Sequence, residues 1–361
     1  MYLPRRLFPF LALLLLMNCL TGETLRVVSW SGSYVKSQIL GFIRPFEEKT
    51  GIEVEVLQYS GGIEEIRSQV RSYNIKWDVV DFELFDALHA CEEGLLEAVD
   101  PSQLPPASDG TPATEDFIPG SLMECGVGSV IGSTVVAYNR EAVPRAPARL
   151  EDFFDLRRFP GPRGLRRTPK VNLEWALIAD GVPPEDVYTV LDTKDGQDRA
   201  FRVLDQIKPF VVWWETGEEA MRLLETGQVA MTSVYNGRVY DAVQRGLPLE
   251  ILWDHQVWFI DVWGIVRHSE NADLAWKFIR FATSTESMAR QVQYIPYGPA
   301  RKSALSEVPE HMSKQLPTAP ANFQNALEGN AKWWSEHQEE LTRRFESWVK
   351  RPVMVPQGLR R

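Results

Sequence analysis

The length, composition and charge of this chain indicate an acidic globular protein with room for two domains. Its 361 residues are 44% hydrophobic and 24% charged, which argues against a disordered or membrane-embedded protein and allows two domains that each bury a core. The formal net charge of −10 argues against nucleic acid and anionic membrane as partners, because both require a basic protein surface.

Residues 1–22 have the pattern of a secretory signal peptide. Arg5 and Arg6 precede an apolar run of 11 residues, Leu7 to Met17, and the small residue Gly22 follows. The run is shorter than the roughly 20 apolar residues that cross a bilayer, which argues against a membrane anchor. An N-terminal core helix is the other alternative, and the position at the extreme N-terminus favours export.

The mature chain is expected to begin after Gly22 and to carry two cysteines. Cleavage there takes the net charge from −10 to −12, because two arginines are removed. Cys19 raises the alternative of a lipoprotein, but Asn18 stands where such a signal has a small Gly, Ala or Ser. Cys91 and Cys125 remain, and an even pair in an oxidising compartment predicts a disulfide. The alternative is two unrelated buried thiols.

The first third of the mature chain alternates between strand and helix patterns. Runs of β-prone residues predict strands, and apolar residues at helical spacing predict the helices between them. The predicted elements are a strand at Leu25–Ser29, a helix from Ile39 to the C-cap Gly51, a strand at Ile52–Leu57, a helix at Ile63–Tyr73 and a strand at Trp77–Phe82. Pro45 argues against continuity of the first helix. This order is typical of a parallel α/β sheet.

The remaining chain repeats this alternation beyond a loop rich in Pro, Ser and Thr at Asp100–Phe117. The β-prone run Val130–Tyr138 is long enough to pass between two lobes, and Val262–Arg267 can carry the chain back. Further predicted helices and strands are Glu174–Ile178, Asp198–Ile207, Val229–Val234, Leu249–Leu252, Leu274–Ala282 and Asn330–Val349. We therefore predict an α/β protein with two lobes and a ligand cleft between them, at the carboxyl ends of the parallel strands.

Signs of catalysis are sparse in the sequence. It has no P-loop and no nucleophile elbow, and neither mature cysteine has a histidine partner. No metal-binding spacing connects the histidines, which are His89, His255, His268, His311 and His337. We expect no enzyme, no cofactor and no metal site. A secreted hydrolase that uses an acid pair remains an alternative, because acidic residues are plentiful.

Aromatic residues are the strongest positive signal for binding. The chain has 12 tryptophans, and several fall at predicted strand ends or in loops: Trp30, Trp213, Trp214, Trp253, Trp258 and Trp263. An aromatic face attracts an ammonium group by about 0.5–2 kcal/mol, and a carboxylate such as Asp261, close to Phe259, adds a charge-assisted hydrogen bond. Core packing is the alternative for any single tryptophan. Aromatic walls also stack on sugars, so a sugar is the alternative ligand.

Several short motifs occur in the same order as in one known family. They are Trp30-Ser31-Gly32-Ser33-Tyr34, Trp77-Asp78-Val79-Val80 with Phe85 beyond it, Tyr235-Asn236-Gly237, Trp258-Phe259-Ile260-Asp261, Tyr294-Ile295-Pro296-Tyr297-Gly298-Pro299 and Trp333-Trp334. Over essentially its whole mature length, the chain resembles the spermidine/putrescine branch of the bacterial extracellular solute-binding proteins of ABC transporters.

The resemblance implies a type II periplasmic-binding-protein fold whose two α/β lobes close on the ligand. On the basis of this fold, we assign residues 23–137 plus 262–305 to the first lobe, 138–261 plus 306–350 to the second, and 351–361 to a tail. It also implies a monomeric periplasmic protein that captures a small amine-bearing solute and works with an ABC permease and an ATPase.

Two departures from the family pattern bear on the ligand. Polyamine-binding relatives have an acidic pair just before the helix of the second lobe, where this chain has Arg167-Thr168-Pro169-Lys170, and its nearest acid is Glu174. Arg238 follows the Tyr235-Asn236-Gly237 turn, and a planar guanidinium suits a carboxylate. With Asp261 for an ammonium and Arg238 for a carboxylate, a zwitterion such as an ω-amino acid or an opine is predicted beside putrescine or spermidine. An Arg238 that points to solvent is the alternative.

The expected site therefore combines aromatic and charged groups from both lobes. Ferric iron is argued against, because Tyr294 and Tyr297 lack a nearby histidine–glutamate set. The predicted ligand-binding residues are Trp30, Ser31, Tyr34, Phe85, Glu174, Tyr235, Arg238, Phe259, Asp261, Tyr297 and Trp334.

Overall fold

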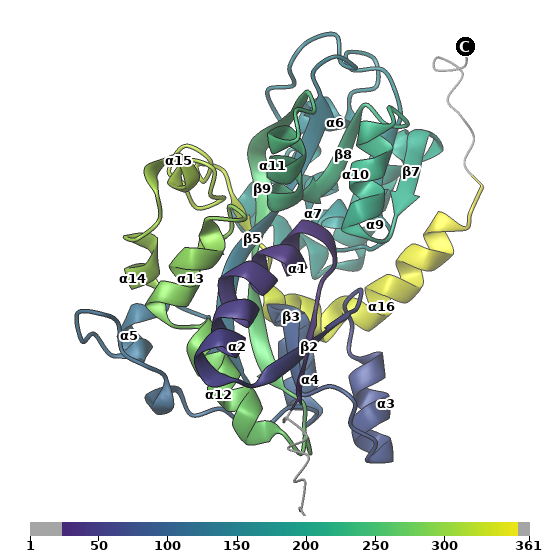
Figure 1. Ribbon diagram of the computed structural model, residues 1–361. Coiled ribbons are helices and arrows are strands. Elements are labelled where there is room, and N and C mark those ends of the chain that lie inside the picture. Colours follow the sequence, from purple (N-terminus) through teal and green to yellow (C-terminus); the bar gives the residue numbers. More distant parts are fainter. Residues whose placement is uncertain (1–23, 353–361) are drawn as a thin grey trace, which may run out of the picture.

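A continuous mixed β-sheet links two α/β lobes in the computed structural model (Figure 1). The structure describes residues 24–352, so the predicted signal peptide, with Cys19 and Gly22, lies outside the described residues, as does the end of the tail (353–361). The strand order is β2-β1-β3-β9-β5-β8-β6-β7. Short strands β10 (Gly298–Pro299), β11 (Leu327–Glu328) and β4 (Leu122–Met123) pair with β5, β9 and β5, respectively.

The first lobe contains the parallel strands that the sequence predicts. They are β1 (Thr24–Ser29), β2 (Glu53–Gln58) and β3 (Val79–Glu83), with β1 in the middle. Its early helical segments are α1 (Gly32–Gln38), the π-helical turn η1 (Ile39–Ile43), α2 (Arg44–Thr50), α3 (Glu64–Ser72) and α4 (Leu84–Glu92). The break that Pro45 predicts from sequence does not occur, because the chain stays helical from Gly32 to Thr50, with the π-helical turn η1 directly before α2, and Gly51 caps α2 at φ 71°.

Two long antiparallel strands, β5 (Gly126–Asn139) and β9 (Leu249–Ile265), run from one lobe into the other. The sequence predicts Leu249–Leu252 and Val262–Arg267 as separate strands, but they belong to one strand whose middle pairs with β5. Register shifts interrupt this pairing twice, between Gly128 and Val130 and between Thr134 and Val136. Because both strands belong to both lobes, the predicted lobe boundaries remain our proposal.

The second lobe is formed around β6 (Arg163–Arg166), β7 (Val211–Trp214) and β8 (Met231–Tyr235). Strand β6 pairs with β7 and β8 in parallel, yet sequence pattern does not predict it. The reason is Arg163, a residue that normally marks a surface. It is fully buried here and donates hydrogen bonds to the carbonyl oxygens of Phe153, Gly161 and Phe159 at 2.6–2.7 Å.

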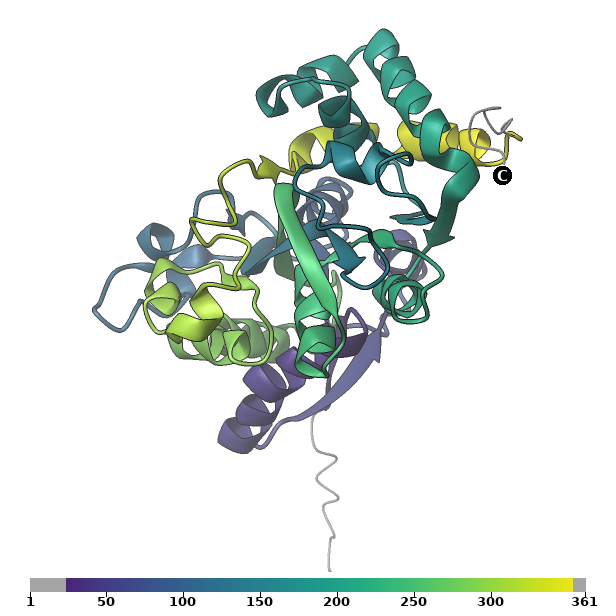
Figure 2. The same cartoon turned by 90° about the horizontal axis from the view of Figure 1, so that it is seen from above.

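Helices cover both faces of the sheet in both lobes (Figures 1 and 2). The longer ones are α7 (Asn172–Ala179), α9 (Lys194–Ile207), α10 (Gly217–Glu225), α11 (Asn236–Gln244), α12 (Ala272–Ala282), α13 (Thr285–Val292) and α16 (Ala331–Val349). The short helices are η2 (Pro101–Gln103), α5 (Ala113–Asp116), α6 (Glu151–Phe154), η3 (Pro184–Asp186), α8 (Val187–Leu191), η4 (Lys208–Phe210), α14 (Lys302–Leu305) and α15 (Glu310–Ser313).

Each lobe has a hydrophobic core on both faces of its part of the sheet. In the first lobe Val27 packs with Phe42 and Phe278 on one face, while its neighbour Val28 packs with Phe82 on the other. Neighbouring residues of a strand point to opposite faces, so these strands read as continuous apolar runs. The second lobe has two cores. Trp175 packs in one of them with Leu204 and Phe345, and Val234 packs in the other with Leu224 and Val239.

The C-terminal helix α16 lies against both lobes (Figure 2). Trp334, Phe345 and Trp348 are buried in the core of the second lobe, while the helix also packs against α4 of the first lobe. The segment before it touches both lobes as well, because Met312 packs with Val292 on α13 and with Tyr240 on α11. No helix among residues 24–352 is long and apolar enough to span a membrane.

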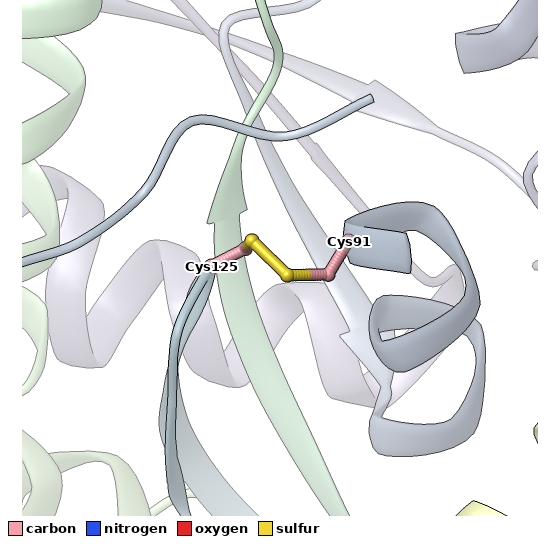
Figure 3. Close-up of a disulfide and its surroundings, with 2 residues drawn as sticks. All are labelled: Cys91 and Cys125. Atoms are coloured by element: carbon pink, nitrogen blue, oxygen red, sulfur yellow. A yellow bond between two sulfur atoms is a disulfide. The ribbon is translucent and has the colours of Figure 1, made fainter. Parts of the chain in front are cut away.

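A disulfide joins Cys91 near the end of α4 to Cys125 just before β5 (Figure 3). Their Cα atoms lie 5.7 Å apart, and 34 positions separate them in the sequence. Cys125 is buried and Cys91 partly buried beside the core residues Ala90 and Leu95. The bond therefore fastens α4, which begins at the ligand cleft described below, to the first crossing strand.

Replacing both cysteines by serine should lower the free energy of unfolding by about 3–4 kcal/mol, because the unfolded chain loses a loop constraint of this length. Denaturant unfolding followed by circular dichroism measures the change. A reducing agent should reproduce the loss in the original protein and leave the double variant unaffected. Equal stability of the two proteins in oxidising buffer would contradict the expected contribution of the bond.

Candidate ligand-binding site

A cleft lies between the lobes, where strands of both sheet halves end. The carboxyl ends of β3, β6 and β8 contribute Glu83, Arg166 and Tyr235, and the middle of β9 contributes Phe259. This main part of the cleft has an empty volume of about 710 Å³ that includes open solvent, which is in the range of small-molecule sites. Its further lining residues include Phe85, Thr134, Thr168, Lys170, Asn172, Trp214, Ser233, Trp258 and Trp334.

A smaller apolar chamber continues the cleft into the first lobe. Glu83, Tyr235 and Phe259 line both spaces, so the two are continuous. The chamber is completed by Trp30, Tyr34, Arg238, Asp261 and Tyr297. We call the main part and this chamber together the interlobe cleft.

Strand pairing gathers buried carboxylates at the chamber. Glu83 lies directly opposite Asp261 in the β3–β9 ladder, and Asp81 comes two residues earlier on β3. All three are at most 3% exposed. Asp81 accepts a hydrogen bond of 2.6 Å from the Gln38 amide, whereas Oδ1 of Asp261 has no hydrogen-bond partner among residues 24–352. The hydroxyl of Tyr34, also buried, is likewise without a partner there.

The burial of these acids shifts their titration. Burial raises the pKa of Asp81 to about 7, although the hydrogen bonds that it accepts from Gln38 and Ser29 oppose the shift. Burial also raises the pKa of Asp261 well above its usual range, and the charge of Asp81 raises it further. A cation that binds beside Asp261 would relieve this cost, because an opposite charge favours the ionised carboxylate.

Aromatic rings enclose the same chamber. The rings of Tyr34 and Tyr297 lie 5.3 Å apart between centroids, and those of Tyr235 and Phe259 lie 5.8 Å apart. Gly132 on β5 makes room for this arrangement, because a Cβ atom there would lie 2.6 Å from Cζ of Phe259. The chamber is therefore apolar apart from Asp261, Glu83 and Arg238.

Cationic groups line the opposite side of the cleft. Nη1 of Arg166 donates to the Tyr235 hydroxyl at 2.7 Å and to Oε1 of Glu83 at 3.3 Å, and its Nε and Nη2 have no partner in the described part of the chain. Trp214, opposite Arg166 in the β6–β7 ladder, has a buried and unpartnered indole N–H. Lys170 forms an ion pair with Glu83, and its Nζ lies 3.7 Å from the centroid of the Phe85 ring.

Contacts between the lobes hold the cleft beside α1. The Arg238 guanidinium pairs with Glu218 at 2.9 Å and donates to the carbonyl oxygen of Ser31 at 3.0 Å. The Ser31 hydroxyl donates to Glu218 at 2.7 Å. Both Gly32, at φ 71°, and Gly217 lie so close to Arg238 that an added Cβ would collide with its guanidinium. Nη1 and Nη2 of Arg238 are thus engaged in this contact, while its buried Nε has no partner among residues 24–352, and we call the group Ser31–Glu218–Arg238 the lobe latch.

Most of the residues proposed from sequence meet at the cleft. Those that line it are Trp30, Tyr34, Phe85, Tyr235, Arg238, Phe259, Asp261, Tyr297 and Trp334. Ser31 lies instead in the lobe latch. Glu174 is fully buried behind the wall, where it accepts hydrogen bonds from Nε1 of Trp334 at 2.7 Å and from Tyr188 at 3.1 Å.

Sequence reasoning did not single out Asp81, Glu83, Arg166 and Lys170 as site residues. Glu83 carries a usable signal, because it directly follows the predicted buried strand Trp77–Phe82. Arg166 ends a strand that the sequence pattern does not reveal. No cluster of His, Cys, Asp and Glu suited to a metal ion occurs between residues 24 and 352.

Comparisons with known proteins agree with this geometry. Residues 41–323 match the family described as bacterial extracellular solute-binding protein. A γ-aminobutyric acid-binding protein of Pseudomonas aeruginosa is 40% identical over 330 residues, covering 91% of this chain and 92% of its own. The spermidine/putrescine-binding periplasmic protein of Escherichia coli is 24% identical over 278 residues, covering 75% of each chain.

Solved structures confirm the type II fold. A periplasmic binding protein from A. tumefaciens B6 in complex with glucopine has a TM-score of 0.84 and 25% identity, covering 91% of this chain and 100% of its own. A γ-aminobutyric acid receptor has a TM-score of 0.80 and 28% identity, covering 92% and 99%. This chain therefore belongs to the bacterial extracellular solute-binding proteins, the periplasmic, non-enzymatic components of ABC transporters that bind a small molecule and work with a permease and an ATPase.

Proposed function

We propose that this protein captures a small zwitterion with one ammonium and one carboxylate, an ω-amino acid such as γ-aminobutyrate or a related opine, for uptake by an ABC importer. One observation carries the proposal: the interlobe cleft is lined by a buried carboxylate, Asp261, whose Oδ1 has no hydrogen-bond partner among residues 24–352, and by an arginine, Arg166, whose Nε and Nη2 have none there either. The 40% identical γ-aminobutyric acid-binding protein supports it.

The ammonium is assigned to Asp261. Asp261, whose Oδ1 has no hydrogen-bond partner among residues 24–352, lines the chamber together with Trp30, Tyr34, Phe259 and Tyr297. Ring faces attract an ammonium ion, and a charge-assisted hydrogen bond to the carboxylate adds to that attraction as water is excluded. Asp81 lies two residues before Glu83, the residue that pairs with Asp261, and it accepts a hydrogen bond from Gln38. Its charge adds negative potential at Asp261.

The carboxylate is assigned to Arg166 rather than to Arg238. Arg238 is engaged by Glu218 and by the carbonyl of Ser31 in the lobe latch. Arg166 keeps Nε and Nη2 without partners in residues 24–352, and the Trp214 indole N–H lies on the neighbouring strand. A planar guanidinium with two such donors suits a carboxylate in a fork arrangement.

A diamine fits this charge distribution less well. Its second ammonium would lie beside Arg166 and Lys170, where like charges repel it. The two spermidine/putrescine-binding relatives from Salmonella are also only 23% identical to this chain. A neutral sugar would leave the buried carboxylate of Asp261 without a charged partner, and an unpaired buried charge is costly.

Lobe closure on the ligand changes the shape of the protein, and the permease can bind the closed form. A ligand that contacts Asp261, on the crossing strand β9 beside β3 of the first lobe, and Arg166 in the second lobe favours the form in which both lobes touch it, in proportion to its differential affinity. The lobe latch adds protein–protein contacts to the same form.

A thermal-shift screen of the purified mature protein tests the proposal. Binding to the folded state raises the melting temperature by mass action, so γ-aminobutyrate or an opine should stabilise the protein more than putrescine, spermidine or maltodextrins at equal concentration. A flat response to all zwitterions, with a shift only on maltodextrins or only on polyamines, would reject it.

Two substitutions test the ammonium contact and the carboxylate contact of the ligand separately. Asp261→Asn is expected to weaken both γ-aminobutyrate and n-butylamine by about 1.5–3 kcal/mol, because each ammonium loses a charged acceptor. Arg166→Gln should weaken γ-aminobutyrate to a similar extent and leave n-butylamine nearly unchanged. Isothermal titration calorimetry measures both, with the exposed Asp273→Asn as control. Equal losses of both ligands on Arg166→Gln would contradict the carboxylate assignment.

Amine binding should depend on pH. Below a pH of about 7, the Asp81 carboxyl of the folded protein keeps a proton, because its pKa is about 7. An ammonium ion that binds at these acids in acidic solution therefore has to displace that proton. Affinity should rise with pH up to about 7 and then level off, with at most one proton released. Calorimetry in buffers of different ionisation enthalpy measures that release, and Asp261→Asn should reduce it.

The unliganded protein should show the linked effect. Because the folded carboxyl keeps its proton where the unfolded one has lost it, the free energy of unfolding should fall as the pH rises from about 4 to about 7. An affinity independent of pH between about 5 and 8 would contradict this account of the site.

A further inference from the structure

A second ammonium site in the cleft is filled by the protein's own lysine. The Nζ atom of Lys170 lies 3.7 Å from the centroid of the Phe85 ring and forms an ion pair with Glu83. An aromatic face beside a carboxylate is the arrangement that binds an alkylammonium ion. The Lys170 side chain is 14% exposed and that of Glu83 is 5% exposed, so the pair is shielded from water.

The contact crosses from one lobe to the other. Glu83 ends β3 and Phe85 opens α4 in the first lobe, whereas Lys170 lies in the loop between β6 and α7 of the second. All three residues line the main part of the cleft, and they also line a more polar pocket that adjoins it. Lys170 therefore occupies space that a ligand would enter if it extended beyond the chamber at Asp261.

The loop is shaped to deliver this lysine. Val171 follows it with φ 71°, a left-handed conformation that is strained for a β-branched residue and persists only where its surroundings enforce it. Asn172 fixes the loop from the other side, because its amide donates to the carbonyl oxygens of Arg166 at 2.8 Å and Thr168 at 2.6 Å. Lys170 is thus held toward Glu83 rather than left free to move.

We propose that Lys170 is a specificity-determining residue that acts as a tethered competitor for the second ammonium of a diamine. Its terminus is a primary alkylammonium, the same group that ends 1,4-diaminobutane. Being covalently attached, it has a high effective concentration at Glu83 and Phe85, so a free amine at low concentration does not replace it. The cleft then accepts ligands with one ammonium at Asp261 and rejects those with two.

This inference rests on the proposed function only in using Asp261 as the first ammonium site. The charge of Lys170 is the property that matters. Burial lowers the pKa of its ammonium to about 7, although Glu174 and Asp261 act to raise it, and the ion pair with Glu83 favours the charged form.

The test is the affinity of 1,4-diaminobutane for the Lys170→Met variant, measured by isothermal titration calorimetry. Methionine keeps the length and apolar stem of the side chain but removes the cation. We expect the Kd for the diamine to fall at least tenfold relative to the original protein. Lys170→Arg, which keeps the charge, should show no such gain. Adding Glu83→Gln to Lys170→Met should abolish it.

A matched control comes from another lysine placed over an aromatic ring. Nζ of Lys208 lies 4.4 Å from the centroid of Trp348 and donates to the carbonyl oxygen of Arg351 at 2.8 Å, outside the interlobe cleft. Lys208→Met therefore loses a comparable buried cation and should leave the diamine affinity unchanged. Glu83 retains Arg166 at 3.3 Å when Lys170 is replaced, and Lys170→Gln provides a second neutral variant if methionine disturbs folding.

The outcomes separate this inference from the proposed function. γ-Aminobutyrate binding by the original protein, with no gain of diamine binding by either neutral variant, would overturn the assignment to Lys170 and leave the proposed function standing. Failure of γ-aminobutyrate to bind, with a tenfold gain for the diamine in Lys170→Met, would do the reverse.

Discussion

The burial of negative charge where the lobes meet is the constraint on which the rest of the site depends. Pairing of β3 with β9 sets Glu83 opposite Asp261 and leaves Asp81 on the same strand as Glu83. Carboxylates taken out of water need counter-charges or protons. The protein provides cations for Glu83, from Arg166 and Lys170, but none for Oδ1 of Asp261 among the described residues.

That imbalance is the basis of the function proposed above. In that proposal, the missing counter-charge at Asp261 favours a ligand ammonium, while the cations around Glu83 favour a carboxylate at the far end. The same groups belong to different lobes, so satisfying them requires the lobes to meet. The lobe latch, formed by Ser31, Glu218 and Arg238, lies beside this contact and depends on glycines at positions 32 and 217. In the proposed function, selectivity and closure therefore have one physical basis.

Much of the fold could be predicted because its early strands are buried on both faces. Val27 and Val28 enter different cores, and such continuous apolar runs stand out in a sequence. The crossing strand β9 was predicted only at its two ends, since polar residues such as Asp254 and Gln256 interrupt its middle. Strand β6 was missed because Arg163 is buried by bonds to carbonyl oxygens that local sequence does not reveal.

The sequence by itself determined the two-lobed α/β architecture, and it pointed to aromatic residues and to the Asp261 carboxylate that line the cleft, because strand periodicity and residue type are local properties. Only the tertiary structure decided which charges are already paired. It committed Arg238 to Glu218 and Glu174 to Trp334, and it brought Lys170 against Glu83, 87 positions away in the chain. Ion pairing depends on distances of a few ångströms between side chains of different lobes, and no spacing along the chain encodes those distances.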